Sequence, residues 1–234
     1  MYYYYEVLGI ILIPAIILSI YAQAKVSGNF HKYSNINASS GITASELVKR
    51  ILNNYGLYDV KVVVNNGDAL NNYYDPTKKI ISLSREVYYS YSVSALGVAC
   101  HEVGHALQYA DNYFPIKLRN AIIPVCNFSS TILWPIVIIG LVFNLAYTSV
   151  GSIILYAGLI LFGASVLFNL FTLPTEYNAS NRAMKLLDSM MILENEELVG
   201  AKKVLSSAAL TYVAALLVSF LNLLRFLLVF RKRD

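Results

Sequence analysis

Charged residues are scarce in this chain of 234 residues: Asp, Glu, Lys and Arg make up 14% of it, against 57% for hydrophobic residues. Soluble domains usually carry about 25% charged residues. The composition therefore excludes an ordinary soluble domain and predicts a membrane protein. The net charge of +4 is small and the basic residues are scattered, so we expect no nucleic-acid partner.

Cysteine and histidine are rarer still. The two cysteines, Cys100 and Cys126, are too few for a disulfide framework and indicate no compartment, and Cys126 lies in an apolar run typical of a small buried hydrophobe. There are only three histidines, and two of them, His101 and His105, lie four residues apart. This concentration makes their segment the first candidate for chemistry.

Residues 120–175 form the longest stretch of the chain that contains no charged residue and no histidine. One membrane crossing takes about 20 residues, so this stretch has room for two crossings joined by a turn, for which residues 146–151 are best suited. We therefore predict a transmembrane hairpin.

Two further apolar segments flank this hairpin in the sequence. Residues 7–24 are uncharged and follow Tyr2 to Tyr5, which suit an interfacial aromatic belt. A cleaved signal peptide is the alternative, because Ala22-Gln23-Ala24 has the small-x-small form, but no Lys or Arg precedes the apolar run. Residues 204–230 are apolar except for Arg225 and end in a basic tail. The sequence thus predicts four spans.

A small water-facing α+β region is predicted for residues 25–120, where charged and amide residues return. Thr43 to Glu46 has the form of a capping box and predicts a helix over 44–55. The β-branched runs 60–64 and 79–83 predict strands, and the second forms a hairpin with residues 72–74 through a turn at 75–78.

A second helix is predicted over residues 92–109, where apolar and small residues recur at intervals of three and four. Residues 173–203 are polar again and are also predicted to be helical. The fold class is therefore a mostly α-helical integral membrane protein. Its expected parts are transmembrane helix 1 (1–24), the water-facing subdomain (25–120), the transmembrane hairpin of helices 2 and 3 (121–172), a polar helix (173–203), and transmembrane helix 4 with its basic tail (204–234).

The segment His101-Glu102-Val103-Gly104-His105 has the HExxH pattern. On a helix, residues i and i+4 share a face, so both imidazoles can bind one zinc ion about 2.0–2.1 Å from their nitrogens. Glu102 would then lie beside the metal, where it can act as the general base that takes a proton from the attacking water. The alternative is a helix whose polar residues face solvent or bond to carbonyls.

A catalytic zinc site needs a third protein ligand and an open position. His31 and Glu86 are candidates, but His31 suits a surface position; Glu194, Glu196 and Glu197 suit a solvated face. Glu176 could instead be an acidic residue in the first turn of a helix, where it interacts favourably with the helix dipole. Two crossings after His105 nevertheless return the chain to the same side of the membrane, which makes Glu176 the preferred third ligand.

Four separated blocks of the sequence resemble one family, the neutral zinc metallopeptidases of bacterial membranes (the YugP-like group). They are YDPTKKIISLS (74–84), SALGVACHEVGHALQ (94–108), LPTEYNASNRA (173–183) and AKKVLSSAALTYVAA (201–215). The chain is more distantly similar to the membrane gluzincins, which include prenyl-protein endopeptidases and heat-shock membrane proteases. The resemblance implies a zincin-like catalytic domain in which His101, His105 and Glu176 bind one Zn²⁺ and Glu102 is the base.

The resemblance also bears on residues around the metal. In the distant relatives an Asp follows the ligand Glu by four residues and orients a histidine; Ser180 stands there in this chain and could accept a weaker hydrogen bond. Ile80, Ile81, Ser82 and Leu83 could form an edge strand that pairs with an extended peptide, or an ordinary hairpin strand. Arg182 or a nearby tyrosine could stabilise the oxyanion.

Basic residues near the span ends favour a cytoplasmic active site in a bacterial cell membrane. Eight lie on the catalytic side, against three on the opposite side: Lys25, Lys32, Lys117, Arg119, Arg182, Lys185, Lys202 and Lys203, against Arg231, Lys232 and Arg233.

The preferred function is a membrane-bound zinc endopeptidase whose partners are the bilayer and a peptide or membrane-protein substrate. A non-enzymatic scaffold or adaptor with a structural metal site is the alternative. A transporter ranks last, because Arg225 is its one intramembrane charge and no repeated halves are present.

Overall fold

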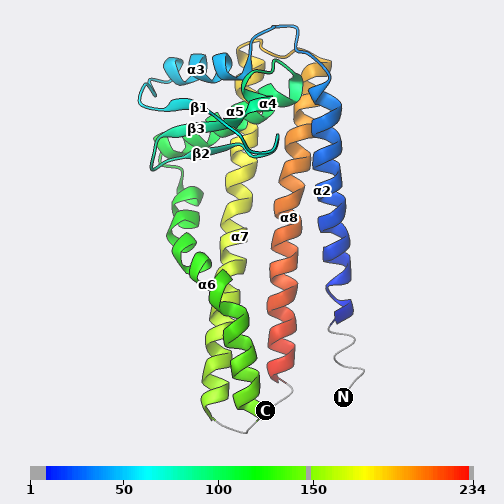
Figure 1. The fold of residues 1–234 in the computed structure, drawn as a ribbon, viewed down its shortest axis with the longest axis vertical. Coiled ribbons are helices and arrows are strands. Elements are labelled where there is room, and N and C mark those ends of the chain that lie inside the picture. Colours follow the sequence, from blue (N-terminus) through cyan, green and yellow to red (C-terminus); the bar gives the residue numbers. More distant parts are fainter. Residues whose placement is uncertain (1–8, 146–148, 232–234) are drawn as a thin grey trace. The chain divides into compact units, whose positions relative to one another are not determined.

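The computed structural model describes residues 9–145 and 149–231. Contacts divide the chain into two units, which we call the mixed unit (Ala22–Tyr113 with Thr175–Thr211) and the helical unit (Met1–Tyr21, Phe114–Pro174 and Tyr212–Asp234). Three helices run through both units: α2 (Ile13–Ser34), α7 (Ser149–Ser189) and α8 (Glu196–Arg231) (Figure 1).

The first helix wholly within the mixed unit is α3 (Ala44–Asn54), and it begins at the predicted capping box. The Thr43 hydroxyl accepts a hydrogen bond from the Glu46 N–H at 3.4 Å, and the Glu46 carboxylate accepts one from the Thr43 N–H at 3.2 Å. These bonds satisfy two backbone donors that the first turn would leave unpaired. The helix buries its apolar face, including Leu47 and Ile51, and the predicted helix is confirmed.

Three strands form the sheet: β1 (Lys61–Asn65), β2 (Tyr73–Asp75) and β3 (Ile80–Ser84). The antiparallel β2–β3 pair confirms the predicted hairpin. Its turn is held by the Asp75 carboxylate, which accepts hydrogen bonds from the backbone N–H groups of Thr77 at 2.9 Å and Lys78 at 3.0 Å. Asp75 thus closes the turn locally, as its side chain commonly does.

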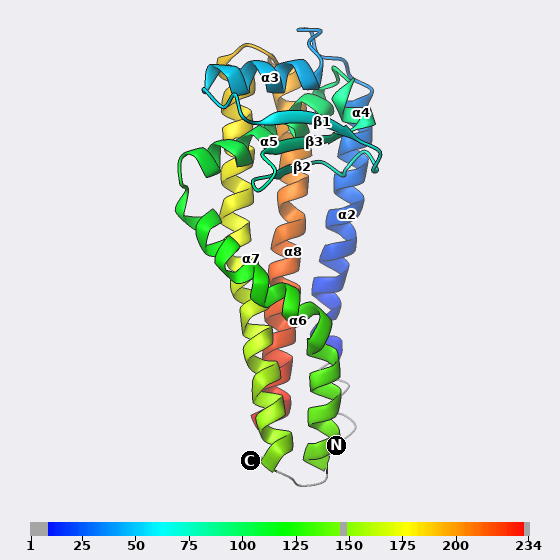
Figure 2. The same ribbon diagram turned by 60° about the vertical axis from the view of Figure 1, so that its left-hand side comes forward.

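The strand order is β1-β3-β2, with β1 parallel to β3 (Figure 2). Of the two alternatives for Ile80 to Leu83, the structure therefore supports the ordinary hairpin strand and not the edge strand. Residues Ile80, Ile81 and Ser82 of β3 pair with β1 on one side and with β2 on the other, so their backbone groups cannot receive a peptide. The available edges belong to β1 and β2.

The strands lead through α4 (Arg85–Tyr88) into α5 (Val93–Ala110), which confirms the helix predicted over 92–109. Ser92 caps α5 by accepting a hydrogen bond from the Ala95 N–H at 3.3 Å. Leu96, Ala99, Cys100 and Val103 are fully buried in a core cluster that also draws on α3, β3, α7 and α8. The core of the mixed unit is therefore built around the helix that carries the HExxH pattern.

The segment 173–203, predicted to be helical, contains a break. Helix α7 continues to Ser189, α8 begins only at Glu196, and between them Met191 and Asn195 have left-handed φ angles of 52° and 42°. Neither glycine nor proline marks this turn in the sequence, so the pattern of polar residues could not reveal it.

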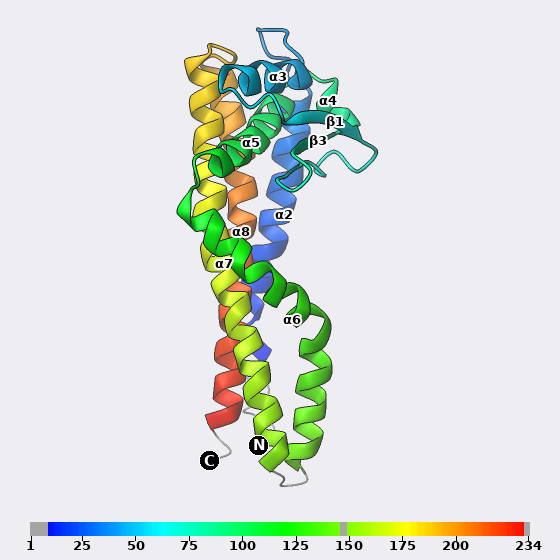
Figure 3. The same ribbon diagram turned by 90° about the vertical axis from the view of Figure 1, so that its left-hand side faces the viewer.

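In the helical unit, α6 (Phe114–Leu145) and α7 form a helical pair. Helix α6 contains Pro124 and Pro135 and is visibly bent (Figure 3), as expected where proline removes a backbone donor. Cys126, which is partly exposed rather than buried, directs its sulfur towards the Ala164 carbonyl of α7 at 3.7 Å. This contact joins the two helices.

Two helices in the described part of the chain are long and apolar enough to cross a membrane: Tyr156–Ser189 within α7 and Glu196–Leu228 within α8. Of the four predicted spans, the described residues therefore support two. Several side chains of α6 lie outside the described part, as do the predicted tyrosine belt and most of the turn at 146–151.

Candidate metal centre

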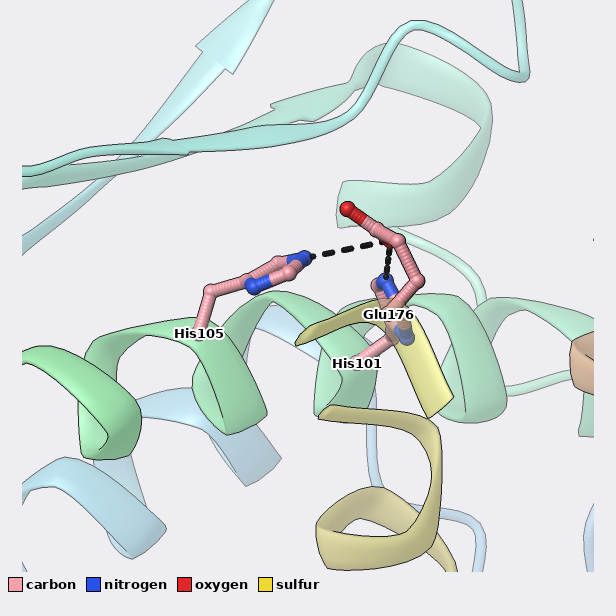
Figure 4. Close-up of side chains that lie close together, drawn as sticks. All are labelled: His101, His105 and Glu176. Carbon is pink, nitrogen blue, oxygen red and sulfur yellow. Dashed lines mark hydrogen bonds and ion pairs between the residues drawn. The ribbon is translucent and has the colours of Figure 1, made fainter. Parts of the chain in front are cut away.

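Two imidazoles and one carboxylate converge in the mixed unit (Figure 4). Glu176 Oε2 lies 3.2 Å from His101 Nε2 and 3.5 Å from His105 Nε2, and the three ligand atoms all lie within 4.8 Å of one another. Ligands of a tetrahedral zinc ion with bonds of 2.0–2.2 Å are about 3.3 Å apart. The donor types and both nitrogen–oxygen distances therefore fit a divalent zinc ion.

The helical geometry of α5 gives the histidines their common direction. His101 and His105 are one turn apart, with ring centroids separated by 4.7 Å. Their side chains are 14% and 12% exposed, and that of Glu176 is 3% exposed. A small opening beside a buried carboxylate suits a metal that keeps a position free for substrate.

Glu176 reaches the histidines because α7 packs very closely against α5. A Cβ atom on Gly104 would lie 2.5 Å from the Ala179 carbonyl oxygen and 3.0 Å from the Ala179 Cα. Both are backbone atoms and cannot move without shifting the helix. Glycine at the fourth position of HEVGH is therefore required for the approach that delivers Glu176, a role that the sequence pattern alone did not reveal.

Each histidine is held through its second ring nitrogen. His101 Nδ1 lies 3.1 Å from the Ser180 hydroxyl, and His105 Nδ1 lies 3.0 Å from Gln108 Oε1. Such contacts leave both Nε2 atoms directed at Glu176 and orient the rings for a metal. The contact of Ser180 with a histidine matches the one that the resemblance implied, whereas Gln108 was not predicted.

Glu102 lies in the same helical turn as His101 and is 6% exposed. Within residues 9–145 and 149–231, no hydrogen bond engages its carboxylate. A buried carboxylate needs a polar partner, so the surroundings of Glu102 suit a group that meets a bound water or substrate.

Burial alone would lower the pKa of His105, but the hydrogen bond and charge of Glu176, the charge of Glu102 and the bond to Gln108 outweigh burial and raise that pKa above its ordinary value of 6.5. The carboxylates thus attract positive charge to this point. Burial raises the pKa of the neighbouring Cys100 thiol, which is fully buried and stays protonated. Cys100 is therefore a core residue.

Arg182 is paired elsewhere. It forms an ion pair with Asp111 and donates from Nε to Asn178 Oδ1 at 2.9 Å. These contacts assign it a structural connection between α5 and α7, and they do not support the predicted oxyanion role.

The other candidate ligands do not join the site. In the described part of the chain, His101, His105 and Glu176 make up the one group of three potential metal ligands. Glu197 instead accepts hydrogen bonds from Ser39. Among the carboxylates considered from the sequence, Glu176 is the one that the described part of the structure places beside both histidines.

Comparison with known proteins agrees with this chemistry. A family model described as "Putative neutral zinc metallopeptidase" matches residues 8–231. The chain is 48% identical over 218 residues to a Bacillus subtilis (strain 168) protein named "Putative membrane protease YugP", covering 93% of this chain and 94% of the relative. No solved structure matches. The chain belongs to this family of neutral zinc metallopeptidases.

Proposed function

We propose that the protein is a membrane-bound endopeptidase of the gluzincin type, in which His101, His105 and Glu176 hold one zinc ion. The convergence of these three side chains beside Glu102 is the observation that carries the proposal. Membership of a zinc metallopeptidase family and the name of the B. subtilis relative support the same reaction class.

When bound, zinc would polarise the scissile carbonyl and lower the pKa of water. Glu102 takes one proton from the attacking water while the water oxygen bonds to the carbonyl carbon. As the carbon–nitrogen bond breaks, Glu102 passes that proton to the leaving amine nitrogen. One water is consumed, and one carboxyl and one amino group are produced.

Strand β2, rather than β3, is the strand that would pair with an extended peptide substrate. Strand β2 is a sheet edge, and Tyr74 on it contacts Tyr109 of α5 with ring centroids 5.5 Å apart. Tyr109 follows His105 by one helical turn and thus lies on the metal-binding face of α5. An extended peptide that pairs with β2 would therefore run beside the metal-binding residues.

The substrate is a peptide or a membrane protein, and the site lies on the cytoplasmic side of a bacterial cell membrane. The two apolar helices and the name of the relative support membrane association, and the distribution of Lys and Arg favours the cytoplasmic side. Because α8 would cross once after the site, a reporter on the C-terminus is expected outside the cell. A cytoplasmic reporter signal would contradict this orientation.

The replacement Glu102→Gln tests the reaction. The variant should bind zinc as the wild type does but lose about 10²–10⁴-fold in peptide hydrolysis, because the amide cannot accept the proton. Glu86→Gln, an exposed change on α4, is the matched control and should retain activity. Undiminished hydrolysis by the Glu102 variant would exclude the proposed base.

A further inference from the structure

Gln108 is the least expected polar residue near the metal-binding group. It follows His105 by three residues on α5, and its side chain is fully buried. A buried amide is costly unless its donors and its acceptor are paired, and the side-chain hydrogen bonds of Gln108 lead to His105 and to α7.

The partners of Gln108 determine which way its amide faces. Its Nε2 atom lies 2.7 Å from the Thr175 carbonyl oxygen and 3.0 Å from Asn178 Oδ1. The carbonyl oxygen can only accept, so the amide nitrogen must be the group that points at it. The amide oxygen of Gln108 therefore faces His105 Nδ1 at 3.0 Å.

Arg182 fixes the orientation of the Asn178 amide in the same manner. Its guanidinium can only donate, so the atom of Asn178 that it contacts at 2.9 Å must be the amide oxygen. Asp111, the residue that caps the C-terminus of α5, holds the guanidinium by an ion pair. The orientations of Asn178 and Gln108 thus follow from groups with a single possible role.

An amide oxygen can only accept, so the nitrogen that meets it must carry hydrogen. We infer that Gln108 is a positioning residue that holds His105 as the Nδ1–H tautomer and leaves the lone pair of Nε2 for the metal. Ser180 cannot impose the same choice on His101, because a hydroxyl can either donate or accept. The chain Asp111–Arg182–Asn178–Gln108 therefore orients one ligand from outside the site.

This inference rests on the proposed metal site, but its test has a readout that needs no metal. The chain contains three histidines, so nitrogen NMR of the full-length, histidine-labelled protein resolves few imidazoles. Metal-free protein at alkaline pH should show His105 protonated on Nδ1. Protonation of His105 on Nε2 instead would overturn the inference without any variant.

Gln108→Met tests the energetic consequence, because methionine is similar in length but has no amide. Zinc affinity, measured by competition with a chelator, should fall about 10–100-fold, the usual cost of losing a group that orients a ligand. The His105 signals should also lose their Nδ1–H preference. Unchanged affinity together with unchanged signals would contradict the assignment.

Two further variants separate positioning from packing. Gln108→Glu keeps an acceptor for His105 and, when protonated, a donor for Thr175, so it should recover most of the affinity that Gln108→Met loses. The same Gln→Met change at the exposed Gln23 should alter nothing. If Gln108→Glu binds zinc no better than Gln108→Met, the positioning role is contradicted. Wild-type protein that shows the Nδ1–H tautomer but binds no zinc would instead refute the proposed function alone.

Discussion

The mixed unit holds most of the large, fully buried apolar side chains, whereas the long helices of the helical unit expose many of theirs. Leu47, Ile51 and Leu96 in the mixed unit are fully buried, but Ile153 and Ile160 on α7 are 68% and 71% exposed. Large exposed apolar surfaces are costly in water and suit contact with lipid chains. The two units are therefore adapted to different solvents, although α2, α7 and α8 pass through both.

Polar side chains differ between the units in the same way. In the mixed unit they connect distant parts of the chain, as Gln108 does with Asn178. In the helical unit, Ser165 donates to the Leu161 carbonyl at 3.2 Å and Asn169 to the Ser165 carbonyl at 3.0 Å, both one turn back on α7. These two side chains of the helical unit are thus satisfied locally, whereas the candidate metal ligands lie in the mixed unit.

The largest expected effect sharpens the contrast in burial. Leu47→Ala should destabilise the protein by about 2–5 kcal/mol, because it removes a fully buried side chain and leaves a cavity. Ile153→Ala, at an exposed position, should change stability far less. Thermal unfolding in detergent measures both, and equal shifts would show that the units do not differ in packing.

Charge placed on the two surfaces should have unequal consequences. Ile160→Lys would put an ammonium group in a candidate span at a cost of about 2.5–3.5 kcal/mol, and should reduce membrane insertion. Tyr58→Lys, at a site that is 78% exposed in the mixed unit, should change stability by no more than about 0.5 kcal/mol. Membrane fractionation compares them, and normal insertion of Ile160→Lys would break the contrast.

Gly104→Ala tests how closely α5 and α7 must approach. The new methyl group would overlap the Ala179 backbone, and such overpacking typically costs about 1–3 kcal/mol. Because Glu176 lies on the displaced helix, zinc affinity should fall as well. Gly97→Ala is the matched control, since its Cβ would meet Ala201 Cβ at an ordinary 3.6 Å. Similar effects of the two changes would refute the proposed role of Gly104.

The smallest effect concerns pH. The pKa of His105 in the metal-free fold is raised above 6.5, so this group stabilises the fold fully below the unfolded pKa, and the gain is lost as pH rises through the folded value. Because zinc needs the unprotonated nitrogen, zinc affinity should fall as the pH is lowered. This fall should begin at a pH above 6.5. Between the unfolded and the folded pKa of His105, calorimetry should therefore show metal-free stability falling as the pH rises, whereas zinc-bound stability should stay level because His105 is unprotonated in both the zinc-bound and the unfolded states.

Features that depend on nearby residues could be predicted from the sequence. The capping box of α3, the β2–β3 hairpin and the extent of α5 each follow from a few adjacent side chains. The placement of His101 and His105 on one face follows from helical periodicity. Glu176 was singled out by the expectation of two membrane crossings between it and His105, and the structure places its carboxylate beside both histidines.

Features that depend on distant partners could not be predicted. The parallel pairing of β1 makes β3 central, and no local pattern in residues 80–83 records it. The roles of Gly104 and Gln108 depend on the backbone of α7, some 70 positions later in the chain. The four spans were predicted from uncharged runs alone, and the described part of the chain supports the two within α7 and α8.

The most direct measurement of the central claim is the zinc content of the purified full-length protein and its Glu176→Gln variant. The account predicts about one zinc per wild-type chain and little in the variant, while Glu196→Gln, an exposed change in the first turn of α8, retains the metal. Zinc absent from the wild type, or retained in full after the loss of the Glu176 carboxylate, would contradict it.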